Sequence, residues 1–521
     1  MENTSVNSRS SEDIEVKQER DTRTEGNQDV RAKTPTQPER PESPIKEAAF
    51  VAVVCAAQLM TQTGLSLAIA PLHIINDSFH ASSKQLTWAS AAYSLTVGTF
   101  ILVAGRLGDL YGHRLMFIIG FTWFGLWCIV GGFSAGSNLV FFTFCRALQG
   151  IGPALLLPNA VAILGRTYPP GPRKDMIFSF FGATAPGGYS LGASFSSLLA
   201  ERVWWPWGYW IMGIACVIFA GLGILVIPYT PTEERQDDGF SWFVRLDITG
   251  AVTGITALVL INFAWNQGPV VGWDMPYTYA LLIVGFILLG GFLAIERKAP
   301  CPLLPPSVFK GEVAWVLGCI SAGWSSFGIL VYYYYQFLEV IDGDSPLLAT
   351  AKWAGSSASG ACASVVTGFL LGRISPSIII FIAMIAFTIG QVMLATMQEG
   401  QVYWAQAFVL MLITPWGMDM SFPSGTVIMS NSMPREHQGV AGSLVTTVVN
   451  YSISLGLGFA GTVQSYVDDD GKDTLKGYRG ASYMGVGLAG LGVVLASCFM
   501  LITWLRRDRD PKSKSLSEQP V

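Results

Sequence analysis

Arg146 and Asp419 are the two charged residues that stand well inside long apolar stretches of this 521-residue chain. Arg146 lies in the stretch 138–165 and Asp419 in the stretch 402–430, whereas the other charged residues fall in tails, loops or the ends of such stretches. A fixed charge in apolar surroundings must face a wet cavity or a partner, and it usually marks an ion or substrate pathway. A hydrogen bond or ion pair that holds two helices together would also explain either residue. We favour the functional interpretation.

The residues around Asp419 suit a carboxylate that binds and releases protons. Pro415 and Pro423 each lack the amide N–H that an α-helix needs, and Gly417 weakens the helix further, so an interrupted helix is predicted here. A carboxylate beside freed backbone carbonyls in a membrane cavity can take up and release a proton. Trp416, nearly one helical turn before Asp419, is a candidate for the substrate path, although a membrane Trp is as often a packing residue.

Membrane-spanning helices must position these two residues. The composition is 51% hydrophobic and only 13% charged, about half the charged fraction of an ordinary globular protein. Repeated apolar stretches of about 20 residues match the ~30 Å hydrocarbon core of a bilayer. The predicted fold class is therefore all-α, a polytopic membrane protein embedded in a lipid bilayer, and a water-soluble enzyme is excluded.

Composition and motifs argue against several other functions. The net charge of −4 provides no basic surface, so no nucleic-acid partner is expected. The eight cysteines form no Cys-x-x-Cys pair and the four histidines are scattered, so neither a metal nor another cofactor is expected. The sequence contains no Gly-x-x-x-x-Gly-Lys-Ser/Thr loop, which argues against ATP hydrolysis by this chain.

Hydropathy predicts fourteen transmembrane helices. An even number places both termini on one side, and Lys and Arg are about twice as frequent in the loops of that side, so both termini are predicted to be cytosolic. The predicted spans are 48–74, 86–104, 115–134, 138–165, 176–200, 207–227, 246–266, 275–295, 313–338, 347–371, 377–397, 402–430, 439–465 and 480–505.

These spans divide into groups of six, two and six. The predicted division is a disordered cytosolic tail over 1–47, a six-helix bundle over 48–227, a linker with two extra transmembrane helices over 228–312, a second six-helix bundle over 313–505 and a cytosolic tail over 506–521.

The loop after the second predicted span combines glycines with charged residues. It reads Gly105-Arg-Leu-Gly-Asp-Leu-Tyr-Gly-His-Arg114. The glycines permit a tight turn and a close approach of helices, and the arginines keep the loop on the cytosolic side. This stretch resembles the cytoplasmic loop signature of the major facilitator superfamily. The resemblance implies a cytoplasmic gate motif, formed here by Gly105, Arg106, Asp109, Gly112 and Arg114.

Two further stretches extend the resemblance. Residues 146–153 resemble the fourth-helix motif of the superfamily, whose arginine is linked to proton coupling, and this implies that role for Arg146. Residues 182–192 resemble the fifth-helix motif that is typical of antiporters. Four residues of this motif are interpreted as hinge or packing residues for alternating access: Pro186, Gly187, Gly188 and Gly192.

The predicted number of fourteen spans resembles that of the drug:proton antiporter branch of the superfamily. In this branch two extra helices lie between the two six-helix halves. The runs 262–273 and 434–443 resemble the fungal aminotriazole-resistance and boron-efflux group, which also includes low-affinity ammonium transporters. The sequence differs from the usual pattern of this branch at two positions. Gln62 occupies a position where members of the branch usually have Asp, and Ala185 occupies one where they usually have Gly. If proton coupling is kept, Asp419 is the only deep carboxylate available for it.

Polar and aromatic residues on two spans are candidates for the substrate path. Tyr332, Tyr335 and Gln336 share one face of a predicted helix and could form an amphipathic wall of a central cavity. An aromatic belt at the outer membrane interface is an equal alternative. Gln58 and Gln62, four residues apart on the first span, form a polar face that could bind substrate or a neighbouring helix.

The sequence therefore predicts a secondary active transporter, expected to be monomeric, that exports small toxic compounds or metabolites by alternating access and inward proton flow. A low-affinity permease or uniporter for ammonium or a small neutral solute, with the same fold, is the alternative. A membrane-embedded sensor, which would bind a small molecule without transporting it, is a less favoured alternative. We expect the plasma membrane rather than the vacuole.

Overall fold

The computed structural model describes residues 43–81, 85, 87–169, 171–229, 240–304, 311–371, 373–431, 438–469 and 471–509. Every regular element among these residues is a helix, in agreement with the predicted all-α class. The predicted tails lie outside the described residues except for 43–47 and 506–509, and so do residues 434–437 of the run 434–443.

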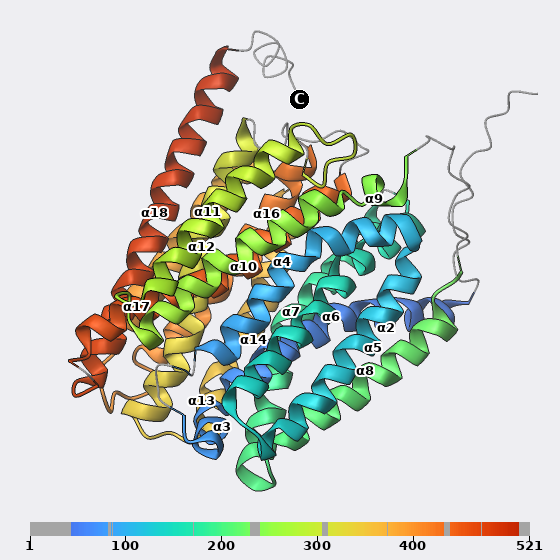
Figure 1. Cartoon of the computed structure of the whole chain (residues 1–521). Coiled ribbons are helices and arrows are strands. Elements are labelled where there is room, and N and C mark those ends of the chain that lie inside the picture. Colours follow the sequence, from blue (N-terminus) through green and yellow to red (C-terminus); the bar gives the residue numbers. More distant parts are fainter. Residues whose placement is uncertain are drawn as a thin grey trace, which may run out of the picture. The chain divides into compact units, whose positions relative to one another are not determined.

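The first half of the chain forms one series of long helices (Figure 1). Proline occupies the first turn of α2, α7 and α8, where its missing N–H breaks no helical hydrogen bond. Asn138 caps α6, because its side chain accepts a hydrogen bond of 2.8 Å from the amide of Phe141. The helices are α2 (Pro44–Ile69), α3 (Leu72–Phe79), α4 (Trp88–Tyr111), α5 (His113–Phe133), α6 (Leu139–Thr167), α7 (Pro172–Arg202) and α8 (Pro206–Val226).

A linker and a second series follow. The linker contains α9 (Trp242–Arg245), α10 (Ile248–Val271) and α11 (Pro276–Glu296). The second series is α12 (Glu312–Gln336), η4 (Phe337–Ile341), α13 (Pro346–Trp353), α14 (Gly355–Leu371), α15 (Pro376–Ala395), α16 (Ala407–Asn431), α17 (Gln438–Val467) and α18 (Thr474–Arg509). The segment η4 is one turn of π-helix that continues α12.

Within the described residues, twelve helices are long and apolar enough to cross a membrane, where the sequence predicts fourteen. The helices α7 and α16 have 31 and 25 residues and coincide with predicted spans, but they are not among these twelve. Several boundaries also differ from the prediction. The helix α2 begins at Pro44 rather than Ala48, and the tenth predicted span is divided into α13 and α14.

The predicted interruption at Pro415 and Pro423 is wrong, because α16 is one continuous helix through both residues. A proline removes one N–H without preventing the neighbouring turns from forming when adjacent helices hold the segment in place. Here Gly417 allows α15 to approach closely, since a Cβ at that position would lie 2.5 Å from the ring of Phe387. The helix is therefore supported by packing rather than broken.

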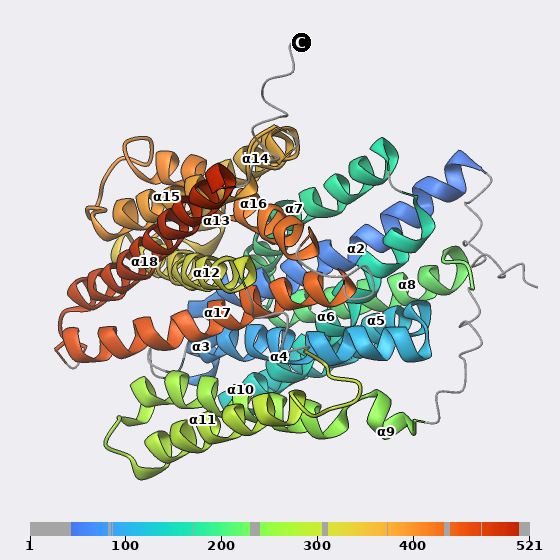
Figure 2. The same ribbon diagram turned by 90° about the horizontal axis from the view of Figure 1, so that it is seen from above.

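The two series of helices pack internally and meet along two seams (Figure 2). At one seam α4 packs against α17, and at the other α7 packs against α13 and α14. We call these the α4–α17 seam and the α7–α14 seam. The linker helix α10 packs against both α17 and α4. We call the end where α2 begins and α18 ends the terminal end, and the opposite end, with the α7–α8 and α17–α18 connections, the distal end.

The α4–α17 seam is joined by very close backbone contact and by polar side chains. A Cβ added to Gly98 would lie 2.7 Å from the backbone nitrogen of Tyr451. Ser454 Oγ on α17 lies 2.9 Å from the carbonyl oxygen of Ala91 on α4 and 2.8 Å from Asn262 Oδ1 on α10. Asn266 of α10 donates a hydrogen bond of 3.1 Å to the carbonyl of Ser454. These bonds connect three helices.

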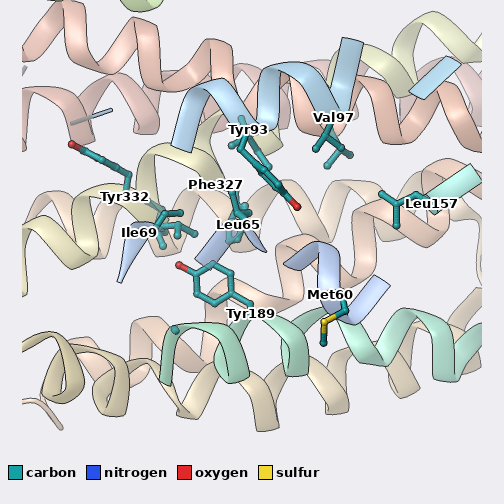
Figure 3. Packing of buried hydrophobic residues seen from close by; sticks show 14 of the residues in the cluster. Met60, Leu65, Ile69, Tyr93, Val97, Leu157, Tyr189, Phe327 and Tyr332 are labelled. Carbon is teal, nitrogen blue, oxygen red and sulfur yellow. The ribbon is translucent and has the colours of Figure 1, made fainter. Parts of the chain in front are cut away.

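The interior between the two series is a continuous apolar core (Figure 3). Leu65 and Ile69 of α2 belong to the same buried cluster as Tyr189 of α7 and Phe327 and Tyr332 of α12. The core therefore crosses from one half of the molecule to the other, and the polar groups described next are set into it.

Candidate functional site

Arg146 is wholly buried within the first half of the molecule. Its Nε donates a hydrogen bond of 2.9 Å to the carbonyl of Ala89, and its Nη1 donates one of 2.8 Å to Gln149 Oε1. The guanidinium lies 4.6 Å from the ring centroid of Tyr93, which places a cation over an aromatic face. The remaining nitrogen, Nη2, is buried and forms no hydrogen bond with the residues that the structure describes.

Tyr93 links this buried cation to the first helix. Its hydroxyl donates a hydrogen bond of 2.7 Å to the carbonyl of Thr61 on α2. Arg146, Tyr93 and Thr61 therefore form a polar connection from α6 through α4 to α2. In this conformation Arg146 is 0% exposed and does not line an aqueous path. It can position Tyr93 and couple α6 to α2.

Asp419 lies on α16 in the second half, at the α7–α14 seam. A Cβ added to Gly360 of α14 would lie 2.9 Å from Asp419 Oδ2 and 3.3 Å from Cβ of Pro186 on α7. Ser364, one turn further along α14, lies beside the same carboxyl group. The side chain is half-buried, and its buried Oδ2 has no hydrogen-bond partner among the described residues. The carboxyl thus sits where α7, α14 and α16 meet.

The structure does not bring Arg146 and Asp419 together. Arg146 contacts residues of α4 and α6, whereas Asp419 lies among residues of α7 and α14. No ion pair found within the described residues includes either of them. An ion pair between helices therefore explains neither residue in the described part of the chain, whereas a hydrogen bond between helices does describe Arg146, which donates from α6 to Ala89 of α4.

Toward the distal end, the α7–α14 seam is closed by side-chain contacts. These come from consecutive turns of α7, so that the two halves of the molecule touch over more than three helical turns. The contacts are a hydrogen bond between the hydroxyls of Ser190 and Ser357, one of 3.1 Å between Ser197 and Thr350, one of 2.5 Å from the amide of Leu347 to Glu201 Oε1, and the rings of Tyr189 and Trp353 at 5.2 Å.

Toward the terminal end, the same two helices present open faces. Gly182, one turn before Pro186 on α7, has no atom within 4 Å of an added Cβ. Gly368, two turns beyond Gly360 on α14, is equally open. Asp419, at the level of Gly360 and Pro186, therefore lies one turn from the Ser190–Ser357 contact, toward the terminal end.

The glycines of the antiporter-like stretch differ in their surroundings. Added Cβ atoms would lie 2.3 Å from the carbonyl oxygen of Leu59 at Gly188 and 2.7 Å from that of Thr63 at Gly192. These two glycines allow the backbones of α7 and α2 to touch. Gly187 has no atom within 4 Å of an added Cβ, so it does not share this contact.

Gly188→Ala is expected to destabilise the protein by about 1–3 kcal/mol, because the new methyl group would overlap with the α2 backbone. Gly187→Ala is the matched control, and its methyl group enters open space one residue away. Thermal unfolding of the two purified variants in detergent measures the difference. Equal unfolding temperatures would contradict the proposed backbone contact.

The other candidates for the substrate path lie at separate places. Trp416 lies nearly one turn before Asp419 on α16. Its Nε1 donates a hydrogen bond of 3.2 Å to Ser359 Oγ of α14, so the indole connects these two helices. Gln58 and Gln62 are half-buried on α2. The structure thus places Trp416 beside Asp419 and leaves the two glutamines on a different helix.

The four consecutive tyrosines Tyr332 to Tyr335 are all buried, with 3% exposure or less, which does not fit an aromatic belt facing lipid. Tyr335 stacks on Trp353 of α13, with ring centroids 5.9 Å apart. Gln336 instead accepts a hydrogen bond of 3.4 Å from Tyr478 of α18. The tyrosines therefore belong to the packed distal interior, and Tyr335 and Gln336 face different helices.

The predicted gate motif forms a network at the terminal end. Asp109 Oδ1 lies 3.6 Å from Arg166 Nη2 and 3.5 Å from His113 Nε2. Arg106 Nε donates to the carbonyl of Arg245 at 3.0 Å, and this contact attaches α4 to the linker helix α9. The motif thus connects α4 with α6 and with the linker.

The remaining residues of the motif place the ends of α4 and α5. Arg114 Nη2 donates to the carbonyl of Ile224 on α8 at 2.6 Å. Gly112 has φ +99° in the turn between α4 and α5, a conformation that residues with a Cβ rarely adopt. A Cβ on Gly105 would lie 3.2 Å from Ser443 Oγ of α17, so this glycine adjoins the opposite half of the molecule.

Besides Asp419, the structure contains another buried carboxylate, Glu339, which the sequence analysis did not identify as buried. The side chain of Glu339 on η4 is only 3% exposed, and within the described part of the chain neither of its oxygens has a hydrogen-bond partner. His73 Nε2 of α3, from the opposite half, lies 3.8 Å from Glu339 Oε2. The predicted ninth span ended at residue 338, so Glu339 was assigned to a loop. The apolar residues on both sides of it, in Phe337–Ile341, were the available signal.

Two more buried carboxylates have structural roles at the linker. Asp247 caps α10, since its Oδ1 accepts a hydrogen bond of 3.1 Å from the amide of Gly250. Glu296 at the end of α11 accepts one of 3.1 Å from the amide of Leu304. Both carboxylates therefore hold chain segments in place.

Comparison with known proteins gives a consistent result. The chain matches the Major Facilitator Superfamily over residues 52–457 and 313–521. The Low affinity ammonium transporter of Saccharomyces cerevisiae is 56% identical over 471 residues, covering 90% of this chain and 92% of the relative. Efflux pump terJ of Aspergillus terreus is 47% identical over 482 residues, covering 92% and 93%. The Aminotriazole resistance protein of S. cerevisiae is 37% identical over 476 residues, covering 89% and 86%.

Solved structures show the same fold at low sequence identity. The peptide transporter POT in complex with sulfate has a TM-score of 0.61 at 13% identity, covering 87% of this chain and 94% of that chain. A mutant of the nucleoside transporter NupG has a TM-score of 0.60 at 13% identity, covering 87% and 99%.

Proposed function

Because the chain belongs to the Major Facilitator Superfamily and is an integral, multi-pass membrane transporter, we propose that it exports small organic molecules in exchange for protons by alternating access. The observation that carries this proposal is the position of Asp419 at the α7–α14 seam between the two halves, one turn from the Ser190–Ser357 contact that closes the seam toward the distal end. A carboxyl in that position can be loaded from one side and, after the seam rearranges, from the other. Relatives named for efflux and for aminotriazole resistance support the direction.

In this proposal the terminal end is cytosolic, and α7 and α16 cross the membrane with the twelve more apolar helices, which gives fourteen spans. Some of their polar residues contact other helices, among them Ser190 and Ser197 on α7 and Ser421 on α16, so a lower hydropathy is compatible with a position in the bundle. Asp419 carries the transported proton, and Arg146 acts by positioning Tyr93 and α2. The protein works as a monomer in the plasma membrane.

A second candidate function is low-affinity uptake of ammonium or of a small neutral solute. It is favoured by the 56% identity with a relative that is named as an ammonium transporter. Gln62, which cannot ionise, also suits transport without proton coupling.

Transport by the purified protein in vesicles with an acidic interior separates the two functions. Labelled aminotriazole and methylammonium serve as the probes, and protein-free vesicles correct for trapping of weak bases. Proton antiport is expected to accumulate aminotriazole above its outside concentration, up to about tenfold per pH unit for one proton, and to lose this accumulation when an ionophore collapses the gradient. If the probes only reach equal concentrations on both sides, whether or not the pH gradient is present, proton antiport is rejected and the permease is favoured.

A further inference from the structure

The buried Glu339 is a group for which the transport scheme above has no role. It lies on η4 at the distal end, in the second half of the molecule, and faces His73 of α3 in the first half at 3.8 Å. The pair therefore bridges the two halves at the end where the α7–α14 seam is closed. Whenever the seam opens at that end, the two residues must separate.

A charged Glu339 would be poorly stabilised in the closed arrangement. Its side chain is 3% exposed, and no residue that the structure describes forms a hydrogen bond with Oε1 or Oε2. A buried ionised carboxylate without partners is strongly unfavourable. Binding of a proton neutralises the carboxylate and so removes this cost. The facing imidazole does not supply a compensating charge, because burial lowers the pKa of His73.

The remaining charged and titratable neighbours add no positive charge. Glu201 of α7 and Asp344 of the following loop both act on Glu339 as further negative charges. Lys352 of α13 is paired with Asp344 rather than with Glu339. The phenols of Tyr189, Tyr332, Tyr335 and Tyr478 face the same group from α7, α12 and α18 and are neutral near pH 7. On the histidine side, Asp77 is the nearby charge.

We propose that Glu339 is the proton-binding residue of the distal gate: its carboxyl is protonated while the α7–α14 seam is closed at the distal end, and it releases that proton to water when the seam opens there. The O–H bond of the carboxyl breaks on opening and re-forms on closing, so one proton is taken up per closure. This inference rests on the proposed alternating access and adds a second proton site, separate from Asp419. Acid on the distal side then favours the closed gate.

The test is a distance measurement by electron spin resonance on the full chain in lipid nanodiscs. Spin labels at V203C and L348C report on the gate, since both positions are exposed and lie at the distal ends of α7 and α13. The exposed Cys362 and Cys498 are replaced by Ser. For one proton, the ratio of closed to open molecules is expected to fall up to about tenfold per unit rise in pH.

In Glu339→Gln the gate is expected to stay closed, and the ratio to change by less than about twofold between pH 5 and pH 8. Glu339→Asp, which keeps an ionisable group, is expected to retain the pH dependence and controls for folding. Glu201→Gln removes a neighbouring carboxyl of the same gate and should also leave the dependence in place. Unchanged pH dependence in Glu339→Gln would overturn the proposal.

Two other outcomes would also reject it. If His73→Gln abolishes the pH dependence while Glu339→Gln keeps it, the imidazole is the titrating group. If ammonium chloride at constant pH closes the gate through Glu339 while protons do not, the site binds a small cation instead. The measurement needs no transport, so pH-dependent closure without proton-driven transport would refute the proposed function alone.

Discussion

Asp419→Asn is expected to abolish proton-driven accumulation of substrate. With a gradient of two pH units, exchange for one proton can hold up to about a 100-fold concentration ratio, and the variant should fall to equal concentrations on both sides. Asparagine has almost the same shape as aspartate but cannot ionise, so the position of the side chain beside Gly360 is retained while the proton site is lost. The measurement is uptake of labelled aminotriazole by vesicles with an acidic interior.

A second measurement shows whether the Asp419→Asn variant is still folded and able to bind. Exchange of labelled for unlabelled substrate at equal pH needs no proton movement and should persist. Asp274→Asn, at an exposed position after α10, is the matched control and should leave gradient-driven uptake unchanged. If Asp419→Asn keeps its full response to the gradient, Asp419 does not carry the proton.

A disulfide between S197C and T350C is expected to stop transport completely and reversibly. The hydroxyls of Ser197 and Thr350 are 3.1 Å apart across the α7–α14 seam, close enough for a bond between cysteines at these positions. The bond would hold the distal end closed, and alternating access requires that end to open. Oxidation should remove uptake and a reducing agent should restore it, in a background without the exposed Cys362 and Cys498.

The control for this disulfide is a bond of similar length within one half of the molecule. Ser321 of α12 and Ser452 of α17 have hydroxyls 3.0 Å apart, and both helices belong to the second half. The S321C–S452C bond should leave transport largely intact. Equal activity of the oxidised and reduced forms of S197C–T350C would show that this seam does not open during transport.

The sequence identified the helices and the charges better than the contacts between them. Each predicted span overlaps one or two helices in the described residues, because a 20-residue apolar stretch has few structural alternatives in a membrane. The prediction of an interruption in α16 was wrong, since it considered the missing N–H groups of Pro415 and Pro423 and not the packing of α15 against Gly417. Neighbouring helices decide such cases, and they cannot be read from one segment.

The candidate site shows the same limit. Arg146 and Asp419 were recognisable from charge in apolar surroundings, and the predicted bundles already placed them in different halves, but the residues that each of them adjoins follow from tertiary packing. Glu339 was missed because its burial depends on His73 and the η4 turn, which a span ending at residue 338 excluded. The sequence pattern also placed Tyr335 and Gln336 on one wall, whereas they contact Trp353 and Tyr478 on different helices.

The contacts at the α4–α17 seam restrict how a solute dissolved in lipid can reach the interior. On that side the backbones of Gly98 and Tyr451 touch, and α10 covers the contact with hydrogen bonds to Ser454. A lateral entrance there would require both the backbone contact and these bonds to break. A solute in the bilayer therefore has no entrance on that side while these contacts hold, and a lateral opening would have to form elsewhere on the molecule.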